Sequence, residues 1–141
     1  MVVDHIAVVV RSLEQAIALW GKAFGYVPMT APVANSRQRV RVVFLAKDGS
    51  ITIKLVEPTD TLSPVHALAA RGGGLHHLCF RCANLNEELA RLEQSGMRIL
   101  ADPQPGEAFE NEPIAFVYAG QGLNVELIET DRKAALLPFK K

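Results

Sequence analysis

Apolar residues along this chain follow two alternating spacings, one typical of strands and one typical of helices. An apolar, β-branched run over 2–10 predicts a buried strand. Apolar residues then recur at helical spacing from Leu13 up to Gly25, where a glycine suits the end of a helix. Two further apolar runs, over 41–46 and 51–57, flank an Asp-Gly turn and predict a hairpin. The first part of the chain therefore predicts a strand, a helix and further strands.

The same succession of elements returns in the second part of the chain. An apolar run over 75–82 predicts a strand, and residues at helical spacing follow from Leu85 up to Gly96. Ser12 and Asn84 precede the two predicted helices, and both have side chains that commonly cap a helix N-terminus. Further strands are predicted over 98–101, 113–118 and 123–129.

The two halves repeat one pattern at a displacement of 72 positions. The segment DHIAVVVRSLEQAI resembles HHLCFRCANLNEEL, so that His5 corresponds to His77. The segment ITIKLVEPTD resembles LNVELIETD, and Lys54 corresponds to Glu126 at the same displacement. Two matching pairs of segments at one displacement indicate an internal duplication of a βαβββ module.

We expect one domain over 1–141, because a single module is too small to bury its sheet alone. The first module covers about 1–60 and the second about 74–130. A linker helix is predicted over about 61–73, with a Ser-Pro pair at its start and glycines at its end. The tail over 131–141 mixes polar and apolar residues, and we expect it to be weakly ordered or used in a contact.

Composition narrows the class of protein further. The chain has 49% hydrophobic and 21% charged residues, which is typical of a soluble globular protein. Fifteen basic and fifteen acidic residues balance to a net charge of zero, which gives no long-range attraction to nucleic acid or to a membrane. The N-terminus lacks the pattern of a signal peptide, and two cysteines are too few for a disulfide framework. We therefore expect a cytoplasmic protein.

Four side chains that can bind a metal or transfer a proton occupy corresponding places in the two modules. His5 and His77 lie on the first strand of each module, and Lys54 and Glu126 lie on the last. If the modules pack about a pseudo-two-fold axis, all four side chains meet in one cleft. A single histidine in an apolar strand is more often structural than a ligand. Two imidazoles and one carboxylate in a duplicated frame instead favour a site for a divalent cation with open positions.

Four motifs carry a resemblance to a known family: DHIAVVV, VVFL with ITIKLVEP, SPVHALAARGGGLHHLCF and GLNVELIE. With these motifs the chain resembles the vicinal-oxygen-chelate superfamily over nearly its whole length, and most of all its methylmalonyl-CoA epimerase group. The expected fold is α+β: a curved, mostly antiparallel eight-stranded sheet around a cleft, with the helices outside. Because one scaffold serves many reactions, the resemblance is more specific for fold than for substrate.

The resemblance implies a ligand set and a reaction type. The family's metal ligands fall on His5, His77 and Glu126, and the metal would be Zn, Ni, Co, Mn or Fe. The implied activity is that of an isomerase, epimerase or lyase acting on a small oxygen-bearing anion through an enolate or enediolate. Glu126 would act as ligand and proton shuttle, and Lys54 is the candidate for a second acid/base group. Members of the family usually form homodimers, and we expect one here.

Lys54 departs from the family, whose fourth ligand is a glutamine or glutamate. A protonated ammonium has no lone pair and repels a divalent ion. Three interpretations follow: the metal keeps three protein ligands, Lys54 is neutral and catalytic, or the site is metal-free and Lys54 forms a salt bridge to Glu126. The last interpretation favours a metal-free, drug-resistance-like binding protein. An Fe(II) ring-cleaving dioxygenase is a further alternative, although neither Tyr26 nor Tyr118 is convincingly placed for it.

Other polar residues carry weaker signals. Strand alternation predicts that His76 points away from His77, as a structural or peripheral residue. Alternation also separates Cys79 from Cys82, so the two thiols are not expected to share a metal. The loop over 106–113 contains three glutamates, which makes it a poor neighbour for the phosphates of coenzyme A.

Overall fold

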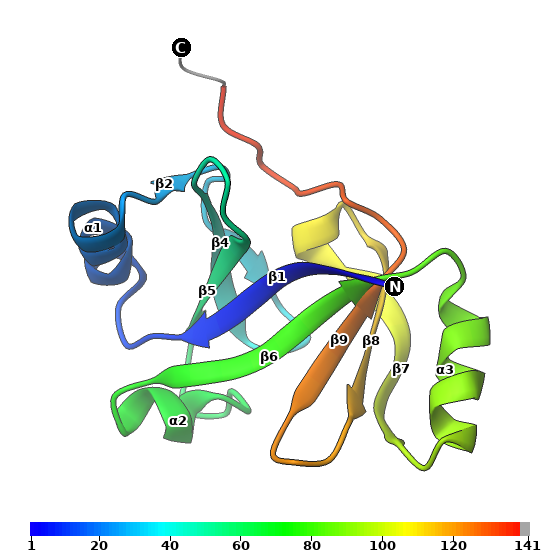
Figure 1. The fold of residues 1–141 in the computed structure, drawn as a ribbon. Coiled ribbons are helices and arrows are strands. Elements are labelled where there is room, and N and C mark those ends of the chain that lie inside the picture. The colour runs from blue at the N-terminus through cyan, green and yellow to red at the C-terminus, as the bar shows by residue number, and fades with distance from the viewer. Residues whose placement is uncertain (139–141) are drawn as a thin grey trace.

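The computed structural model describes residues 1–138 of the chain as one curved sheet with helices on its outside (Figure 1). The sheet order is β2-β4-β5-β1-β6-β9-β8-β7, with β3 also paired to β4. The first half contains β1 (Val2–Val9), α1 (Leu13–Phe24), β2 (Val27–Pro28), β3 (Val33–Asn35), β4 (Val40–Ala46), β5 (Thr52–Pro58) and α2 (His66–Ala70). The second half contains β6 (Gly74–Arg81), α3 (Leu85–Gln94), β7 (Arg98–Gly106), η1 (Glu107–Phe109), β8 (Glu112–Tyr118) and β9 (Asn124–Ile128).

The two halves have the same internal topology. In each half the first strand pairs in parallel with the last, β1 with β5 and β6 with β9. The two first strands, β1 and β6, pair with each other antiparallel at the centre of the sheet. The other pairings among the described strands are antiparallel. The α+β fold expected from the duplication is therefore confirmed.

The sheet has nine strands where eight were expected, because one edge strand is divided. β2 and β3 both pair with β4 and together occupy the place that β7 has in the second half. Pro28 and Pro32 lie at this interruption, and proline has no N–H to continue a ladder. Between them, the Thr30 hydroxyl accepts a hydrogen bond from the Phe44 N–H (3.0 Å).

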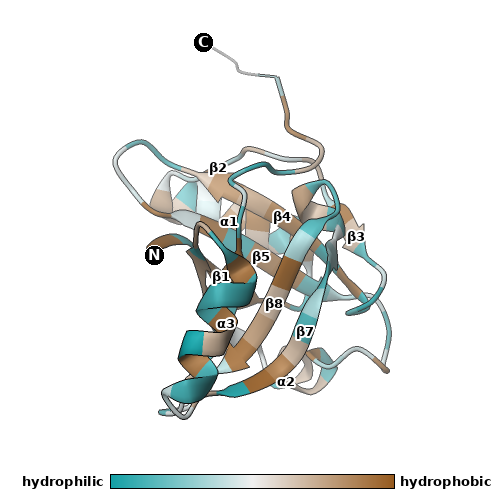
Figure 2. Ribbon diagram, turned by 90° about the vertical axis from the view of Figure 1, so that its right-hand side faces the viewer, coloured by the Kyte–Doolittle hydropathy of each residue, from teal (hydrophilic) through white to brown (hydrophobic). Residues whose placement is uncertain are grey.

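Both long helices begin where the sequence predicts. The Ser12 side chain accepts from the Gln15 N–H, and the Asn84 side chain accepts from the Glu87 N–H. α1 and α3 cover the outer face of the sheet through separate apolar clusters, and α3 turns hydrophilic residues outward (Figure 2). α2 is shorter than the predicted linker helix. Among the described helices, none is both long and apolar enough to cross a membrane.

Two β-bulges interrupt the central ladder between β1 and β6. Val3 pairs with Phe80 and the next pair is His5 with Cys79, so Asp4 is an extra residue in β1. Ala7 pairs with His77 and the next pair is Val8 with Leu75, so His76 is an extra residue in β6. Asp4 and His76 are 72 positions apart, as are the other corresponding residues of the two modules. The duplication therefore includes its bulges.

The described part of the tail runs back over the segment between β2 and β3 and over η1. The Ala31 N–H donates to the Ala135 carbonyl, the Ala134 N–H to the Ala108 carbonyl and the Leu137 N–H to the Met29 carbonyl. This segment, residues 131–137, is called the strap below. The tail was expected to be weakly ordered or used in a contact, and residues 139–141 of it lie outside the described part.

Gly73 provides a test of how tightly α2 is joined to the sheet. A Cβ on Gly73 would overlap the backbone carbonyl of Val9, whereas a Cβ on Gly72 would meet open space. Both glycines have positive φ, so alanine costs about 1–2 kcal/mol at either position. We expect Gly73→Ala to lower the free energy of unfolding by about 1–3 kcal/mol more than Gly72→Ala, measured by urea denaturation. An equal decrease in the free energy of unfolding for both variants would show that the backbone at Val9 moves away from the added methyl group at little cost.

Candidate metal centre between the two modules

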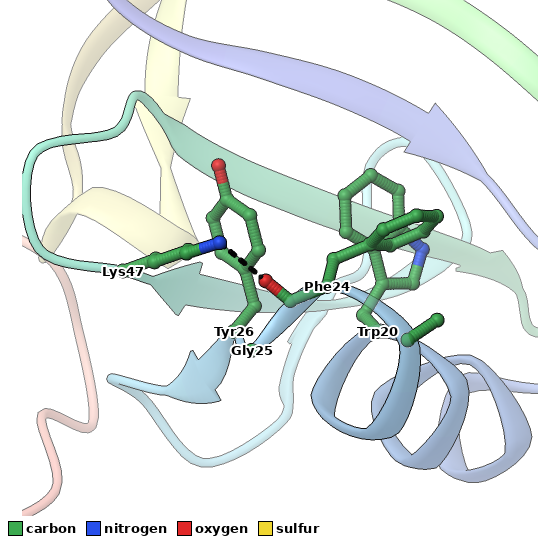
Figure 3. A pocket seen from close by; sticks show the side chains of 6 residues that line it. Trp20, Phe24, Gly25, Tyr26 and Lys47 are labelled. Carbon is green, nitrogen blue, oxygen red and sulfur yellow. Dashed lines mark hydrogen bonds between the residues drawn. The ribbon is translucent and has the colours of Figure 1, made fainter.

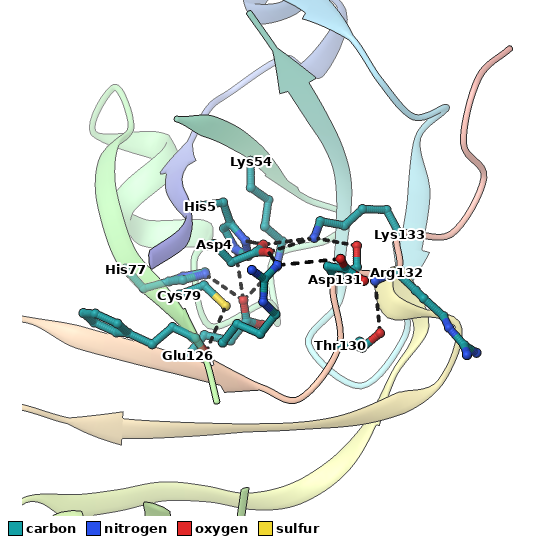
Figure 4. A network of polar contacts seen from close by, with 12 residues as sticks. Asp4, His5, Lys54, His77, Cys79, Glu126, Thr130, Asp131, Arg132 and Lys133 are labelled. Carbon is teal, nitrogen blue, oxygen red and sulfur yellow. Dashed lines mark hydrogen bonds and ion pairs between the residues drawn. The ribbon is translucent and has the colours of Figure 1, made fainter. Parts of the chain in front are cut away.

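Four adjacent strands bring the predicted site residues together. His5, Lys54, His77 and Glu126 lie on β1, β5, β6 and β9, which are neighbours in the order β5-β1-β6-β9. The Glu126 Oε1 atom lies 3.1 Å from His5 Nε2, 3.3 Å from His77 Nε2 and 3.6 Å from Lys54 Nζ. Figure 4 shows the side chains of both modules converging on this carboxylate.

The cluster is buried, and several of its polar atoms have no hydrogen-bond partner. His5 and Glu126 have 0% exposed surface, His77 has 4% and Lys54 has 5%. Within residues 1–138, both imidazole Nε2 atoms and both Glu126 oxygens lack a partner with hydrogen-bond geometry, in spite of the short distances. Buried polar atoms normally have a partner, so four facing atoms without one fit a bound cation.

The ionisation of these groups also fits a cation. Burial alone would raise the pKa of Glu126, but the nearby ammonium of Lys54 holds this pKa well below its ordinary value. Burial lowers the pKa of His77 to about 3, so that its ring is neutral and keeps a lone pair. The ligand atoms of His5, His77 and Glu126 lie within 4.8 Å of one another. Two imidazoles and one carboxylate form a set that binds divalent metals.

Lys54 occupies the corner that the resemblance assigns to a fourth ligand. Its ammonium is 3.6 Å from Glu126 and lies 5.4 Å from the centre of the Phe109 ring. The salt bridge considered in one interpretation of the sequence is thus present. Because Lys54 has a flexible four-carbon stem, this contact does not bar the ammonium from moving when a cation enters.

Asp4 contacts the His5 ring and Lys133 contacts Asp4, and neither role was predicted from the sequence. The Asp4 carboxylate is 2.7 Å from His5 Nδ1, and Lys133 Nζ of the strap lies 3.0 Å from the same carboxylate (Figure 4). Burial would raise the pKa of Asp4, but His5 and Lys133 lower it below the ordinary value. A ligand histidine commonly donates its second ring N–H to a carboxylate, so an aspartate next to His5 in the sequence could have indicated this role for Asp4. Lys133 offered no such signal.

The expected direction of the His76 side chain is wrong. Strand alternation places it on the face opposite His77, yet its Nδ1 atom lies 2.7 Å from His77 Nδ1. The bulge in β6 is the physical reason, because an extra residue breaks the alternation locally and re-aims its side chain. His76 therefore belongs to the surroundings of the cluster.

The remaining candidates lie apart from the cluster or at its border. Cys79 is buried beside Glu126, and burial raises the pKa of its thiol. The Cys82 thiol instead contacts the carbonyl of Ile128. Neither tyrosine hydroxyl joins the cluster: that of Tyr26 contacts Ser50 and Ile51, and that of Tyr118 accepts from Gly122 in the turn between β8 and β9. This placement gives no support to a ring-cleaving dioxygenase.

Two hollows differ in their relation to the cluster. One of about 620 Å³ lies at the end of α1, where Trp20, Phe24 and Tyr26 surround it and Lys47 Nζ donates to the Phe24 carbonyl (Figure 3). A smaller hollow is lined by Arg37, Gln38, Gln104 and Phe116, among other residues. Because the Phe116 ring is centred 5.4 Å from that of His77, the smaller hollow adjoins the cluster.

Comparisons with known proteins give the chain a family context. The sequence model of the Glyoxalase/Bleomycin resistance protein/Dioxygenase superfamily matches residues 4–116. The uncharacterized protein YqjC of Bacillus subtilis is 33% identical over 129 residues, 89% of this chain and 90% of that protein. The mitochondrial methylmalonyl-CoA epimerase of Bos taurus is 30% identical over 128 residues, 88% of this chain and 71% of that protein. A variant of the Streptomyces coelicolor methylmalonyl-CoA epimerase, in complex with 2-nitronate-propionyl-CoA, superposes with a TM-score of 0.78 at 28% identity, covering 91% and 96% of the chains.

The neutral state of His77 makes the metal-free protein sensitive to acid. The folded ring has a pKa of about 3, against an ordinary value of 6.5, so between these values the unfolded chain binds the additional proton. We expect the free energy of unfolding to fall by about 1.4 kcal/mol per pH unit from this group as pH drops below 6.5. Urea denaturation at a series of pH values, with a chelator present, measures this change in the free energy of unfolding. His77→Asn should flatten the slope and His66→Asn on α2 should not; equal slopes in wild type and His77→Asn would contradict the assignment.

Proposed function

The chain belongs to the Glyoxalase/Bleomycin resistance protein/Dioxygenase superfamily, and we propose that it is a metal-dependent isomerase of the epimerase type. One observation carries the proposal: His5, His77 and Glu126 face one another in a buried cluster with unsatisfied ligand atoms. The similarity to methylmalonyl-CoA epimerases supports the reaction type. A protein of this kind would contain its own metal and act on small molecules.

His5, His77 and Glu126 would hold the metal, which is Zn, Ni, Co, Mn or Fe. Three protein ligands leave positions open for substrate oxygens. A bound divalent cation supplies Lewis acidity, which stabilises the negative charge that develops on those oxygens. The burial of the cluster excludes bulk water, which strengthens the electrostatic interactions inside it.

Proton transfer is assigned to Glu126 and Lys54. Epimerisation needs an acid/base group on each side of the substrate carbon. β9 and β5 flank the central pair of strands on opposite sides, so that Glu126 and Lys54 approach the cluster from opposite sides. The ionised carboxylate of Glu126 can accept a proton at Oε1 or Oε2, and the ammonium of Lys54 can donate one. Their ion pair would open around the substrate.

The proposed substrate is a small oxygen-bearing anion, and an acyl-CoA thioester is the first to test because two similar proteins are named for one. In the acidic loop, Glu107 accepts hydrogen bonds from Ser36, which leaves Glu110 and Glu112 as its other carboxylates. A second function, metal-free binding of a small molecule, is favoured by one observation, the Lys54–Glu126 ion pair. A cytoplasmic location stays a prediction.

We also propose a homodimer. The sheet is open, with β7 at one edge and the interrupted pair β2 and β3 at the other, and open edges favour association. Light scattering should give about twice the 15.4 kDa mass of the chain at micromolar concentration. A monomer under these conditions would refute the assembly and leave the site proposal intact.

The metal can be tested directly. Protein purified without chelator, or reconstituted, should bind about one divalent ion per chain, measured by elemental analysis and calorimetry. His5→Ala and His77→Ala should each abolish binding, because each removes one of three ligands. His66→Ala, a histidine change on α2, is the matched control and should bind normally. A metal-free wild type after reconstitution would favour the binding-protein alternative.

Lys54→Gln separates the two candidate functions. In a metal site, the change replaces a repelling charge by an oxygen ligand, and metal affinity should rise. In a metal-free site, the same change leaves the buried Glu126 carboxylate without its partner and should destabilise the fold by about 3–5 kcal/mol. Calorimetric metal titration and thermal denaturation of this one variant measure both effects. Weaker metal binding together with lower stability would contradict both assignments.

A further inference from the structure

We propose that His76 is a positioning residue for the metal ligand His77, and that Asp4 and His76 are a duplicated pair of such residues, each placed by a β-bulge behind the ligand histidine of its own module. This inference rests on the proposed function, because it assigns a role toward the metal. It goes beyond that function because it assigns a role to His76, which is not one of the proposed metal ligands.

The duplicated bulges carry the proposal. Asp4 is the extra residue in β1 immediately before His5, and His76 is the extra residue in β6 immediately before His77. In both modules the extra side chain turns back to the Nδ1 atom of its neighbour, at 2.7 Å. Regular alternation would send each of these side chains to the other face of the sheet. The irregularity thus places two polar groups against two ligand rings, at positions that correspond in the duplication.

The hydrogen bonds determine which nitrogen of each ring is free. A carboxylate accepts only, so Asp4 holds the proton of His5 on Nδ1 and leaves Nε2 with a lone pair toward Glu126. The same arrangement for His77 requires His76 to accept through its Nδ1 and to carry its own proton on Nε2. A neutral imidazole offers one such acceptor nitrogen together with one N–H.

The two modules then differ in a defined way. His5 donates to an ionised carboxylate that Lys133 also contacts, whereas His77 donates to a neutral imidazole. A hydrogen bond to a charged acceptor is stronger than one to a neutral acceptor and raises the basicity of the ligand ring more. The ring of His5 is therefore held by the stronger hydrogen bond, whereas the ring of His77 depends on a weaker one that a single substitution can remove.

Three variants test the positioning role. His76→Leu removes the acceptor, and His76→Asn replaces it, because the asparagine Oδ1 can take the place of the imidazole Nδ1. His66→Leu is the matched control, since His66 lies on α2 and lines a separate surface hollow with Arg11 and Pro58. Two quantities are measured: the affinity for Co(II) by competition with a chelator, and the protonated nitrogen of His77 by ¹⁵N NMR of the metal-free protein.

We expect His76→Leu to weaken Co(II) binding by about 10–100-fold, with the loss largely restored in His76→Asn and absent in His66→Leu. Metal-free wild type should carry the His77 proton on Nδ1, and His76→Leu should release this preference. Unchanged affinity in His76→Leu, or an asparagine variant as weak as the leucine variant, would overturn the positioning role. A wild-type proton on Nε2 of His77 would overturn it as well.

The NMR measurement keeps this inference separate from the proposed function. Wild-type protein that binds no metal would refute the proposed function, and the proton position of His77 would still decide whether His76 fixes the ring. If His76→Leu does not fold, the comparison of His76→Asn with wild type decides: near-equal affinity and the same proton position support the role, and loss of either overturns it.

Discussion

A fully buried carboxylate is the constraint around which the centre of this molecule is arranged. Glu126 has no exposed surface, and an isolated charge in such a place is very costly. The two imidazoles and the ammonium of Lys54 surround its Oε1 atom, and the ammonium holds the carboxylate ionised. These groups come from both modules, so the interface between modules and the candidate site are one structural unit.

The duplication explains the shape of the site, and the differences between the copies explain its chemistry. Lys54 and Glu126 correspond to each other, as do Asp4 and His76. If the positions of Lys54 and Glu126 held the same residue, two like charges would meet at the centre of the site and repel each other. The present sequence instead gives each pair a different residue in each half. The duplication thus determines where the side chains lie. The differences between the two copies give the opposite charges of Lys54 and Glu126 and the different hydrogen-bond partners of the two ligand histidines.

Much of this arrangement could be predicted from the sequence, and the rest could not for physical reasons. The duplication, the caps at Ser12 and Asn84 and the meeting of the four site residues follow from local pattern and from one displacement. The position of His76 does not, because a β-bulge has no reliable sequence signature and reverses the face of one residue. Lys133 is 129 positions from its partner Asp4, and no local pattern reports so distant a contact.

Charge balance links the proposed metal to the proposed kind of substrate. Four ionised side chains are almost fully buried around the site: Asp4 and Glu126 are negative, and Lys54 and Lys133 are positive. This group is neutral as a whole, so a divalent cation adds two uncompensated positive charges to a place with little water. Desolvated charge of that size requires nearby compensation. In the proposed function an anionic substrate would provide it, whereas a neutral ligand would not. The buried charges therefore support the proposal that the substrate is a small oxygen-bearing anion.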